Sequence, residues 1–517
     1  MATDMATAPR MTHSAYSSAP SVCRLVCALS LAGLGGLSIN SAFAEVVIEP
    51  SIRARMTYTD NVSLTEDGEA DFVTEVTPSI SVRRTGGRLT GSASGGVRNV
   101  SYANDSDRSS SFIDFRGRGQ YEAIDDTLFI EAVGSVGRRD RSLFSARSES
   151  DALNTDSSNE TRFFSLAPRL EFSLGAGVRG TLRYQQTWNS GASATSRQRT
   201  GTWNLNLADQ EALGALGWFF NYSKTNTQYD GGLRDVNNEL MRLGLSYQLT
   251  PRFVARGSVG RESNDFSLQG EQEKTTHGFG FDWTPTPRTS FSAFTEERLF
   301  GRSYDVSLRH RARRSAWSLI YSRDYSSSNS VIEASAEDYY YNYWSNLLSD
   351  SGVSDPALLD ALARLLAAQN GSANIGFVSN TQTLRRNLRG TVTLTGVRNT
   401  VTVSLYRNET ERLTPDLIVS GLDDFALSNH ITTSGATASW VHRVSGASNL
   451  NASLSRQDTQ GDGGTTDRDQ TRTGLSVGLT RRIGPNTNGA LLYTHTRRSG
   501  DVSGDENSLS ATLGIRF

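Results

Sequence analysis

The chain closes on the stretch Ser-Leu-Ser-Ala-Thr-Leu-Gly-Ile-Arg-Phe, which occupies residues 508–517. Because successive side chains of a β-strand point to opposite faces, this stretch predicts a strand with one apolar and one polar face. The apolar face would carry Leu509, Ala511, Leu513, Ile515 and Phe517. Terminal residues of soluble domains are usually frayed and polar, so an aromatic end is unusual there. The alternative at this point is an ordinary edge strand of a soluble β-domain.

The same alternation recurs from Glu45 onward, for example in segments 48–58, 72–82, 178–188 and 241–249. Short turns and longer polar loops alternate between these segments, as they do in transmembrane β-barrels. The turns predict an all-β, antiparallel up-and-down barrel of about 22 strands, within a range of about 18 to 22, with periplasmic termini. A soluble β-sandwich or β-helix is the alternative, and it accounts poorly for so many long strands with an apolar face. Turns are expected near Gly86, Asp125, Gly175, Asp209, Pro251, Pro285, Arg313, Asn399, Gly446 and Pro485.

The first 44 residues are predicted to be a cleaved signal peptide. Arg10 and Arg24 supply a basic region, residues 25–39 an apolar region, and Ala-Phe-Ala at 42–44 a cleavage site. The apolar region is too short and too rich in glycine for a stable membrane-spanning helix, although a membrane anchor is the alternative. Residues 45–517 are then expected to form the barrel.

Composition narrows the possible functions further. Both cysteines, Cys23 and Cys27, lie in the leader, which leaves no disulfide or cysteine-based metal site in the mature chain. The formal net charge is −2, so no bulk attraction to nucleic acid is expected. Hydrophobic residues make up 36% of the chain and the mean hydropathy is −0.42. A barrel gives such values because every second residue of its strands is polar.

The polar faces predict an arginine-rich lumen. Arginine pairs well with carboxylates, phosphates and sugars, and rings of charge set the selectivity of pores. We therefore expect anionic or hydroxyl-rich chains to be preferred over cations. Glu75, Glu122 and Glu171 would add some negative charge. The arginines expected to line the lumen are Arg53, Arg55, Arg116, Arg118, Arg179, Arg183, Arg242 and Arg472.

An insert at about 327–377 breaks the rhythm of strands. Ser354-Asp355-Pro356 is typical of a helix start, and residues 357–368 carry a leucine stripe that predicts a helix. The insert would either cover the extracellular mouth or fold into the lumen as a gate. Its aromatic cluster, which would pack on the helix or stack on sugar rings, consists of Tyr339, Tyr340, Tyr341, Tyr343 and Trp344.

No catalytic, cofactor-binding or metal site is expected. A G-x-G-x-x-G match at 175–180 leads into a strand rather than a helix, and a G-x-S-x-G match at 474–478 lies in mid-strand. The histidines after the leader are scattered, without the spacing of a triad or a metal site. The acidic loop around 458–469 is interpreted as solvated, with Ca²⁺ binding or bridging to lipopolysaccharide as the alternative.

Thr-Tyr-Thr-Asp-Asn-Val at 57–62, just after the leader, extends this interpretation. With the repeat, the insert and the terminal Phe517, it resembles the outer-membrane β-barrel proteins associated with the exosortase and PEP-CTERM sorting system. That family looks like an accessory of exopolysaccharide production and export in Gram-negative bacteria, and it offers no catalytic residues to carry over. The resemblance to outer-membrane barrels also implies that the barrel-assembly machinery reads Phe517.

Three functions stay open at this stage. The first is a channel or scaffold for exopolysaccharide export in the outer membrane of a Gram-negative bacterium. The second is a general diffusion porin, and the third is a barrel that anchors sorted proteins without transport. The expected partners are outer-membrane lipid or lipopolysaccharide, the assembly machinery, and polysaccharide with its export components. A plug-bearing TonB-dependent receptor is not expected, because the first strand begins close to the cleavage site.

Overall fold

The computed structural model describes residues 45–140, 142–145, 153, 158–175, 177–191, 197–230, 234–267, 270–326, 345, 379, 381–414, 423–464 and 467–517. The predicted signal peptide lies outside these residues. So does the predicted insert at 327–377, apart from Ser345. Residues 46–517 form one compact unit.

This unit is a 22-stranded antiparallel sheet. Its first strands are β1 (Glu45–Thr59), β2 (Asp71–Thr85), β3 (Leu89–Tyr102), β4 (Ser110–Ile124), β5 (Leu128–Asp140), β6 (Ser158–Leu174), β7 (Val178–Ser190), β8 (Gln198–Leu213), β9 (Leu216–Tyr229), β10 (Val236–Thr250) and β11 (Phe253–Asn264). The others are β12 (Gln272–Thr286), β13 (Thr289–Arg298), β14 (Gly301–Arg311), β15 (Ser315–Ser326), β16 (Thr383–Thr395), β17 (Asn399–Arg412), β18 (His430–Ser445), β19 (Ser448–Asp462), β20 (Arg468–Arg482), β21 (Thr487–Gly500) and β22 (Gly504–Arg516).

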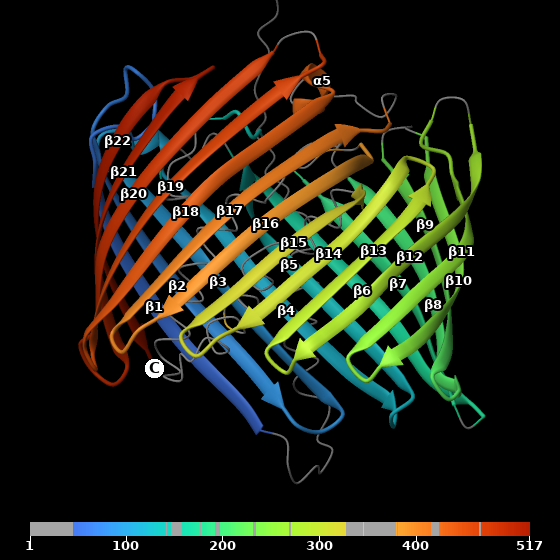
Figure 1. Ribbon diagram of the computed structural model, residues 1–517. Helices are drawn as coiled ribbons and strands as arrows, with labels where there is room; N and C mark the ends of the chain where they lie inside the picture. The colour runs from blue at the N-terminus through green and yellow to red at the C-terminus, as the bar shows by residue number, and fades with distance from the viewer. Residues whose placement is uncertain are drawn as a thin grey trace, which may run out of the picture. The chain divides into compact units, whose positions relative to one another are not determined.

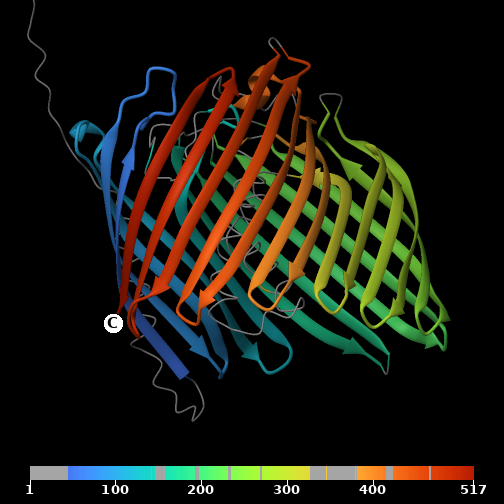
Figure 2. The same ribbon diagram turned by 60° about the vertical axis from the view of Figure 1, so that its left-hand side comes forward.

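The sheet closes on itself through its first and last strands. β1 pairs with β22 in a register that runs from Ser51 opposite Arg516 to Thr59 opposite Ser508. Every other strand pairs with its neighbours in sequence, so no open edge remains. The backbone amide of Phe517 continues the closure by donating to the carbonyl oxygen of Pro50 at 2.9 Å. The predicted up-and-down barrel of 22 strands is confirmed, and the strands follow one another around the wall in Figures 1 and 2.

The alternation of the sequence becomes the two faces of this wall. Met56, Leu245 and Phe279 are 52%, 56% and 62% exposed, whereas Thr57 next to Met56 is 2% exposed. A continuous band of large exposed apolar side chains would be unfavourable in water and is what hydrocarbon requires. The chain is therefore an outer-membrane β-barrel whose apolar row faces lipid.

The two ends of the barrel differ in their connections. Short turns lie at the end that holds the carboxy terminus, at the bottom of Figure 1, and most longer connections lie at the other end. Short periplasmic turns and longer extracellular loops are the rule for such barrels, so the upper end is extracellular. One expected turn was wrong, because Asp209 still pairs with Trp218 and the chain reverses at Gly214 instead. Gly214 adopts φ 70, a left-handed conformation that glycine tolerates best.

One extracellular connection also departs from the expected rhythm. Only Leu299 and Phe300 join β13 to β14, which are also short strands. The described helices are η1 (Ser106–Arg108) and α5 (Asp424–Leu427), both in extracellular connections. No helix among the described residues is long and apolar enough to cross a membrane.

Buried apolar side chains gather at the extracellular end of the barrel. Three small clusters form there from strand ends and loops. They are built around Val73 and Tyr102, around Phe144 and Phe425, and around Tyr229 and Phe266. The extracellular end is therefore where loops pack against the wall.

Candidate functional site

The polar face of the wall is concave. Arg242 on β10 and Glu296 on β13 are joined by two hydrogen bonds, of which the Nε–Oε1 bond measures 2.7 Å. Neighbouring strands are about 4.8 Å apart, so strands three positions apart are separated by about 14 Å along the sheet. Long side chains bridge that distance only when the sheet curves toward them. The polar face therefore lines the lumen.

The arginines expected from the sequence lie on the face opposite the exposed apolar rows. Three of them are paired with carboxylates of other strands. Arg55 lies 3.4 Å from Glu75, and Arg183 lies 3.2 Å from Glu131. Arg242 is paired with Glu296, whose side chain is 1% exposed. The remaining predicted positions, on β1, β4, β7 and β20, are Arg53, Arg116, Arg118, Arg179 and Arg472.

Carboxylates offset much of this positive charge. Glu131 also pairs with Arg169 at 3.0 Å, and Arg169 contacts Glu171 as well. Glu122 is not part of this network; it accepts a hydrogen bond from the backbone amide of Asp126 at the periplasmic turn. The paired arginines and carboxylates make several parts of the wall close to neutral.

Hydroxyl groups occupy much of the remaining inner face. Thr391 and Ser404 lie 3.1 Å apart and Thr393 and Thr402 lie 3.2 Å apart across β16 and β17. The same kind of contact links Ser292 to Ser307, Thr57 to Ser510 and Ser453 to Ser476. Such hydroxyls both donate and accept, so they can exchange these bonds for bonds to another hydroxyl-rich molecule.

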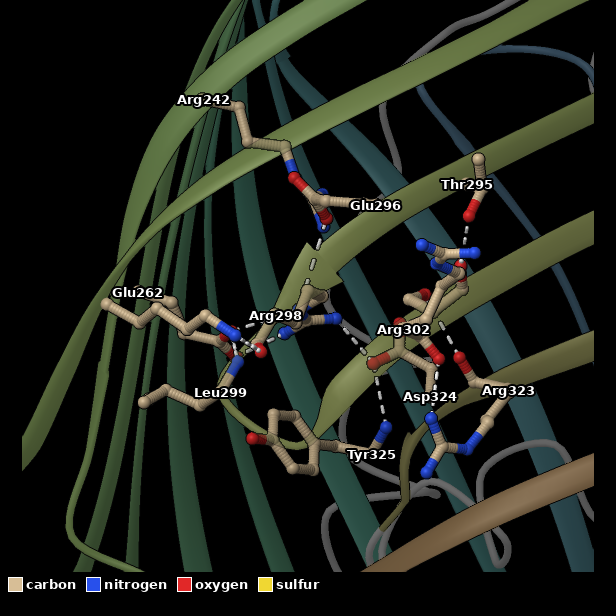
Figure 3. Close-up of polar contacts among 12 residues, drawn as sticks. Arg242, Glu262, Thr295, Glu296, Arg298, Leu299, Arg302, Arg323, Asp324 and Tyr325 are labelled. Carbon is tan, nitrogen blue, oxygen red and sulfur yellow. Dashed lines mark hydrogen bonds and ion pairs between the residues drawn. The ribbon is translucent and has the colours of Figure 1, made fainter.

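A buried charge network lies at the extracellular end of β11, β13 and β15 (Figure 3). Arg298 donates to both carboxylate oxygens of Glu262, at 2.6 and 3.2 Å. It also donates to Asp324 at 2.5 Å and lies 3.9 Å from Glu296. The side chains of Arg298 and Glu262 are 3% and 0% exposed. Such burial is tolerable because opposite charges and hydrogen bonds compensate for lost hydration.

The short β13–β14 turn is built onto this network. The backbone amide of Leu299 donates to Glu262 Oε2 at 2.9 Å. Phe300 and Tyr325 place their rings 5.1 and 5.0 Å from the guanidinium of Arg298. The network thus fixes the turn and the ends of three strands as one rigid part of the rim.

A second group of contacts, which we call the loop clasp, joins the β5–β6 connection to the β17–β18 connection. Asp424 of α5 accepts hydrogen bonds from Ser142 Oγ at 2.5 Å and from the Leu143 amide at 2.7 Å. Arg468 of β20 donates to the same carboxylate at 2.9 Å and lies 3.9 Å above the ring of Phe144. The loop clasp consists of Ser142, Leu143, Phe144, Asp424, Arg468 and Arg498.

Strand β21 contributes Arg498 to the loop clasp. Arg498 donates to the carbonyl oxygen of Phe144 and, at 2.7 Å, to Gln470 Oε1. Burial raises the pKa of the Asp424 carboxyl above its ordinary value. The hydrogen bonds from Ser142, Leu143 and Arg468 act in the opposite direction and offset part of this rise. The β5–β6 connection is therefore held against strands that lie well beyond its own neighbours in the wall.

Another long-range contact links different strands at the same end. Gln382, just before β16, donates to the hydroxyl of Tyr229 on β9 at 2.9 Å. Tyr229 packs with Val236 and Phe266, and Tyr325 and Leu413 pack against them. Parts of the wall seven strands apart, β9 and β16, thus meet through side chains near the extracellular mouth.

Two further expectations concerned the predicted insert and metal binding. Tyr339, Tyr340, Tyr341, Tyr343 and Trp344 lie outside the described residues, and so does the predicted helix at 357–368. Among the residues that the structure describes, no group of three or more His, Cys, Asp or Glu side chains could hold a metal ion.

Sequence reasoning missed the buried network and the loop clasp. Alternation does place Glu262, Glu296 and Arg298 on polar faces near extracellular strand ends, which is a usable signal for their orientation. It gives no information on which strands curve toward each other. Ser142 and Asp424 lie in connections without any periodic pattern, so nothing in the sequence signals their contact.

Comparisons with known proteins concern the architecture. No protein-family model and no curated protein matches the chain. It is similar to the FrpB iron transporter from Neisseria meningitidis, at 12% identity over 91% of this chain and 81% of that chain, with a TM-score of 0.48. A mutant of the ferric enterobactin receptor PfeA from Pseudomonas aeruginosa gives 10% identity, 91% and 80% coverage and a TM-score of 0.48. A loop-deletion mutant of OmpT from Vibrio cholerae gives 8% identity over 92% of this chain and 99% of that chain, with a TM-score of 0.32. At such low identity the similarity concerns the barrel alone.

Proposed function

We propose that this barrel is a gated outer-membrane channel for hydroxyl-rich polymers, accessory to exopolysaccharide export, and that it is not an enzyme. The observation that carries the proposal is the combination of a hydroxyl-rich, charge-paired inner wall with connections clasped to one another at the extracellular end. Paired Ser and Thr hydroxyls, such as Thr393 with Thr402, can exchange partners with a sugar chain. The resemblance of residues 57–62 to the exosortase-associated barrels points to the same class of cargo.

The loop clasp favours a gated channel over a general diffusion porin. A diffusion porin keeps a permanently open aqueous path, whereas here Asp424 and Arg498 tie the β5–β6 connection to other parts of the rim. Release of these contacts would accompany passage of a polymer. The lumen of a large barrel is commonly obstructed, because an unobstructed lumen would let solutes leak across the membrane.

Reconstitution in planar bilayers tests the proposal. The purified barrel should conduct poorly, and the variant Asp424→Ala should conduct more. Added dextran oligomers should interrupt the current of the variant more than polyethylene glycol of the same length does, because dextran carries hydroxyls along its whole chain. In cells, deletion of the gene should lower the exopolysaccharide released into the medium. A large, permanently open conductance of the unmodified protein, insensitive to either polymer, would instead identify a general diffusion porin.

A further inference from the structure

The outward face carries basic side chains at its extracellular border. On several strands, the outward positions just beyond the exposed apolar row hold arginine or lysine. Arg407 follows Leu405 on β17, and Arg456 follows Leu454 on β19, where the leucines are 60% and 53% exposed. Exposed basic residues at this border include Arg162, Lys224, Arg261, Arg302, Arg386, Arg407, Arg456 and Arg497.

Most of these residues face one carboxylate each, for example Arg261 with Glu273 and Arg456 with Asp458. Glu297 is shared by Lys274 and Arg302, at 3.0 and 3.9 Å. At the border of β16 and β17, which run side by side in Figure 1, the two basic residues that share a carboxylate are both arginines. There Arg386 and Arg407 share the single carboxylate of Glu409.

In this cluster Arg386 Nη1 lies 2.5 Å from Glu409 Oε2, and Arg407 Nε lies 2.8 Å from Glu409 Oε1. The two arginine side chains are 44% and 59% exposed. One carboxylate between two guanidinium groups leaves one positive charge. Each guanidinium also carries five N–H donors, more than one carboxylate can occupy.

We propose that Arg386 and Arg407 bind the phosphorylated headgroup of a lipid in the outer leaflet, a lipid A phosphate. Guanidinium groups match phosphate oxygens in charge and in the geometry of their donors. Leu388 and Leu405, two residues toward the periplasm on the same strands, are 41% and 60% exposed and face the hydrocarbon. A lipid whose acyl chains lie against these leucines has its headgroup at the level of the arginines.

Glu409 orients the two arginines in the absence of a lipid and competes with the phosphate for them. Removal of its charge should therefore strengthen binding, whereas removal of the arginines should weaken it. This opposition of sign separates a phosphate site from a pair of arginines that only stabilises the wall. The proposal concerns the outer surface and does not depend on what passes through the lumen.

Binding of lipid A to the barrel in phosphatidylcholine nanodiscs tests this site. The double variant Arg386→Ser, Arg407→Ser should bind bisphosphorylated lipid A about tenfold or more weakly than the unmodified protein, since charged hydrogen bonds are lost. The matched control Arg456→Ser, which removes an arginine with its own carboxylate, should bind within about twofold of the unmodified protein, because exposed pairs contribute little. The variant Glu409→Gln should bind several-fold more tightly. Heat-modifiable migration in gels confirms that each variant forms a barrel.

Other outcomes would overturn the proposal. Equal affinity of the unmodified protein for bisphosphorylated and dephosphorylated lipid A would show that no phosphate is recognised. If the double variant and Arg456→Ser lost the same affinity for lipid A, then sharing one carboxylate would not distinguish Arg386 and Arg407 from other exposed arginines. Full competition by pyrophosphate would identify a site for a free anion in place of a lipid.

Discussion

Arg298 of β13 and Glu262 of β11 form a two-bond ion pair inside the extracellular rim, with 3% and 0% of their side chains exposed. β12 lies between their two strands, so the side chains can meet only because the wall curves. Asp324 and Glu296 complete the surroundings of the guanidinium. The rim at β11 to β15 is thus fixed by a charge network, beside the apolar cluster of Tyr229, Val236 and Phe266.

Removal of one partner from this pair should be costly. Glu262→Ala leaves Arg298 with less compensation for its lost hydration and leaves the Leu299 amide without its acceptor. A loss of about 3–5 kcal/mol in the free energy of unfolding is expected for breaking a buried ion pair. Urea-induced unfolding in lipid vesicles measures it, with Glu273→Ala, which removes an exposed pair with Arg261, as the control. Equal stability of the two variants would contradict the assignment.

The loop clasp should restrict conductance. A disulfide between Ser142→Cys and Asp424→Cys, whose native side-chain oxygens lie 2.5 Å apart, should hold the two connections together. The only native cysteines are Cys23 and Cys27, so replacing both with serine leaves the engineered pair without a competitor. Single-channel recording should show low conductance in the oxidised barrel and higher conductance after reduction. No change on reduction would mean that the clasp lies beside the conducting path.

Two arginines of β4 should influence ion selectivity. Arg116 and Arg118 lie on the inward face and are exposed there. The double variant Arg116→Ser, Arg118→Ser should shift the reversal potential of the open channel toward cations, because charge on the lumen wall sets selectivity. Arg481→Ser, on the outward face of β20, is the control. An unchanged reversal potential in the β4 variant would exclude these arginines from the selectivity of the pore.

Phe517 should matter for assembly more than for stability. The residue is 72% exposed, so its deletion removes little packing, and its backbone amide donates to the carbonyl oxygen of Pro50. Deletion should nevertheless deplete the protein from outer-membrane fractions if the assembly machinery reads the terminal aromatic residue. Fractionation and heat-modifiable migration measure this depletion. Phe517→Tyr, which keeps an aromatic end, should restore normal levels, and full assembly of the deletion variant would contradict the prediction.

The sequence alone determined the barrel. A period of two residues is a local property of strands, so alternation in 48–58 or 241–249 already separates the lipid face from the lumen face. Closure was expected from the resemblance of the last ten residues to the closing strand of an outer-membrane barrel, and the pairing of β1 with β22 confirms it. The turn expected at Asp209 failed for a local reason, since the strand continues through an irregular register and Gly214 supplies the reversal.

Only the tertiary structure decided which polar residues meet. The contact of Leu143 with Asp424 joins residues 281 positions apart, and neither lies in a periodic segment. Likewise, the sequence predicted that Arg242 faces the lumen but not that Glu296, three strands away, neutralises it. Pairings of this kind depend on the curvature of the closed wall and on the paths of the extracellular connections. Both arise from the whole ring of strands, whereas side-chain alternation is set within each strand.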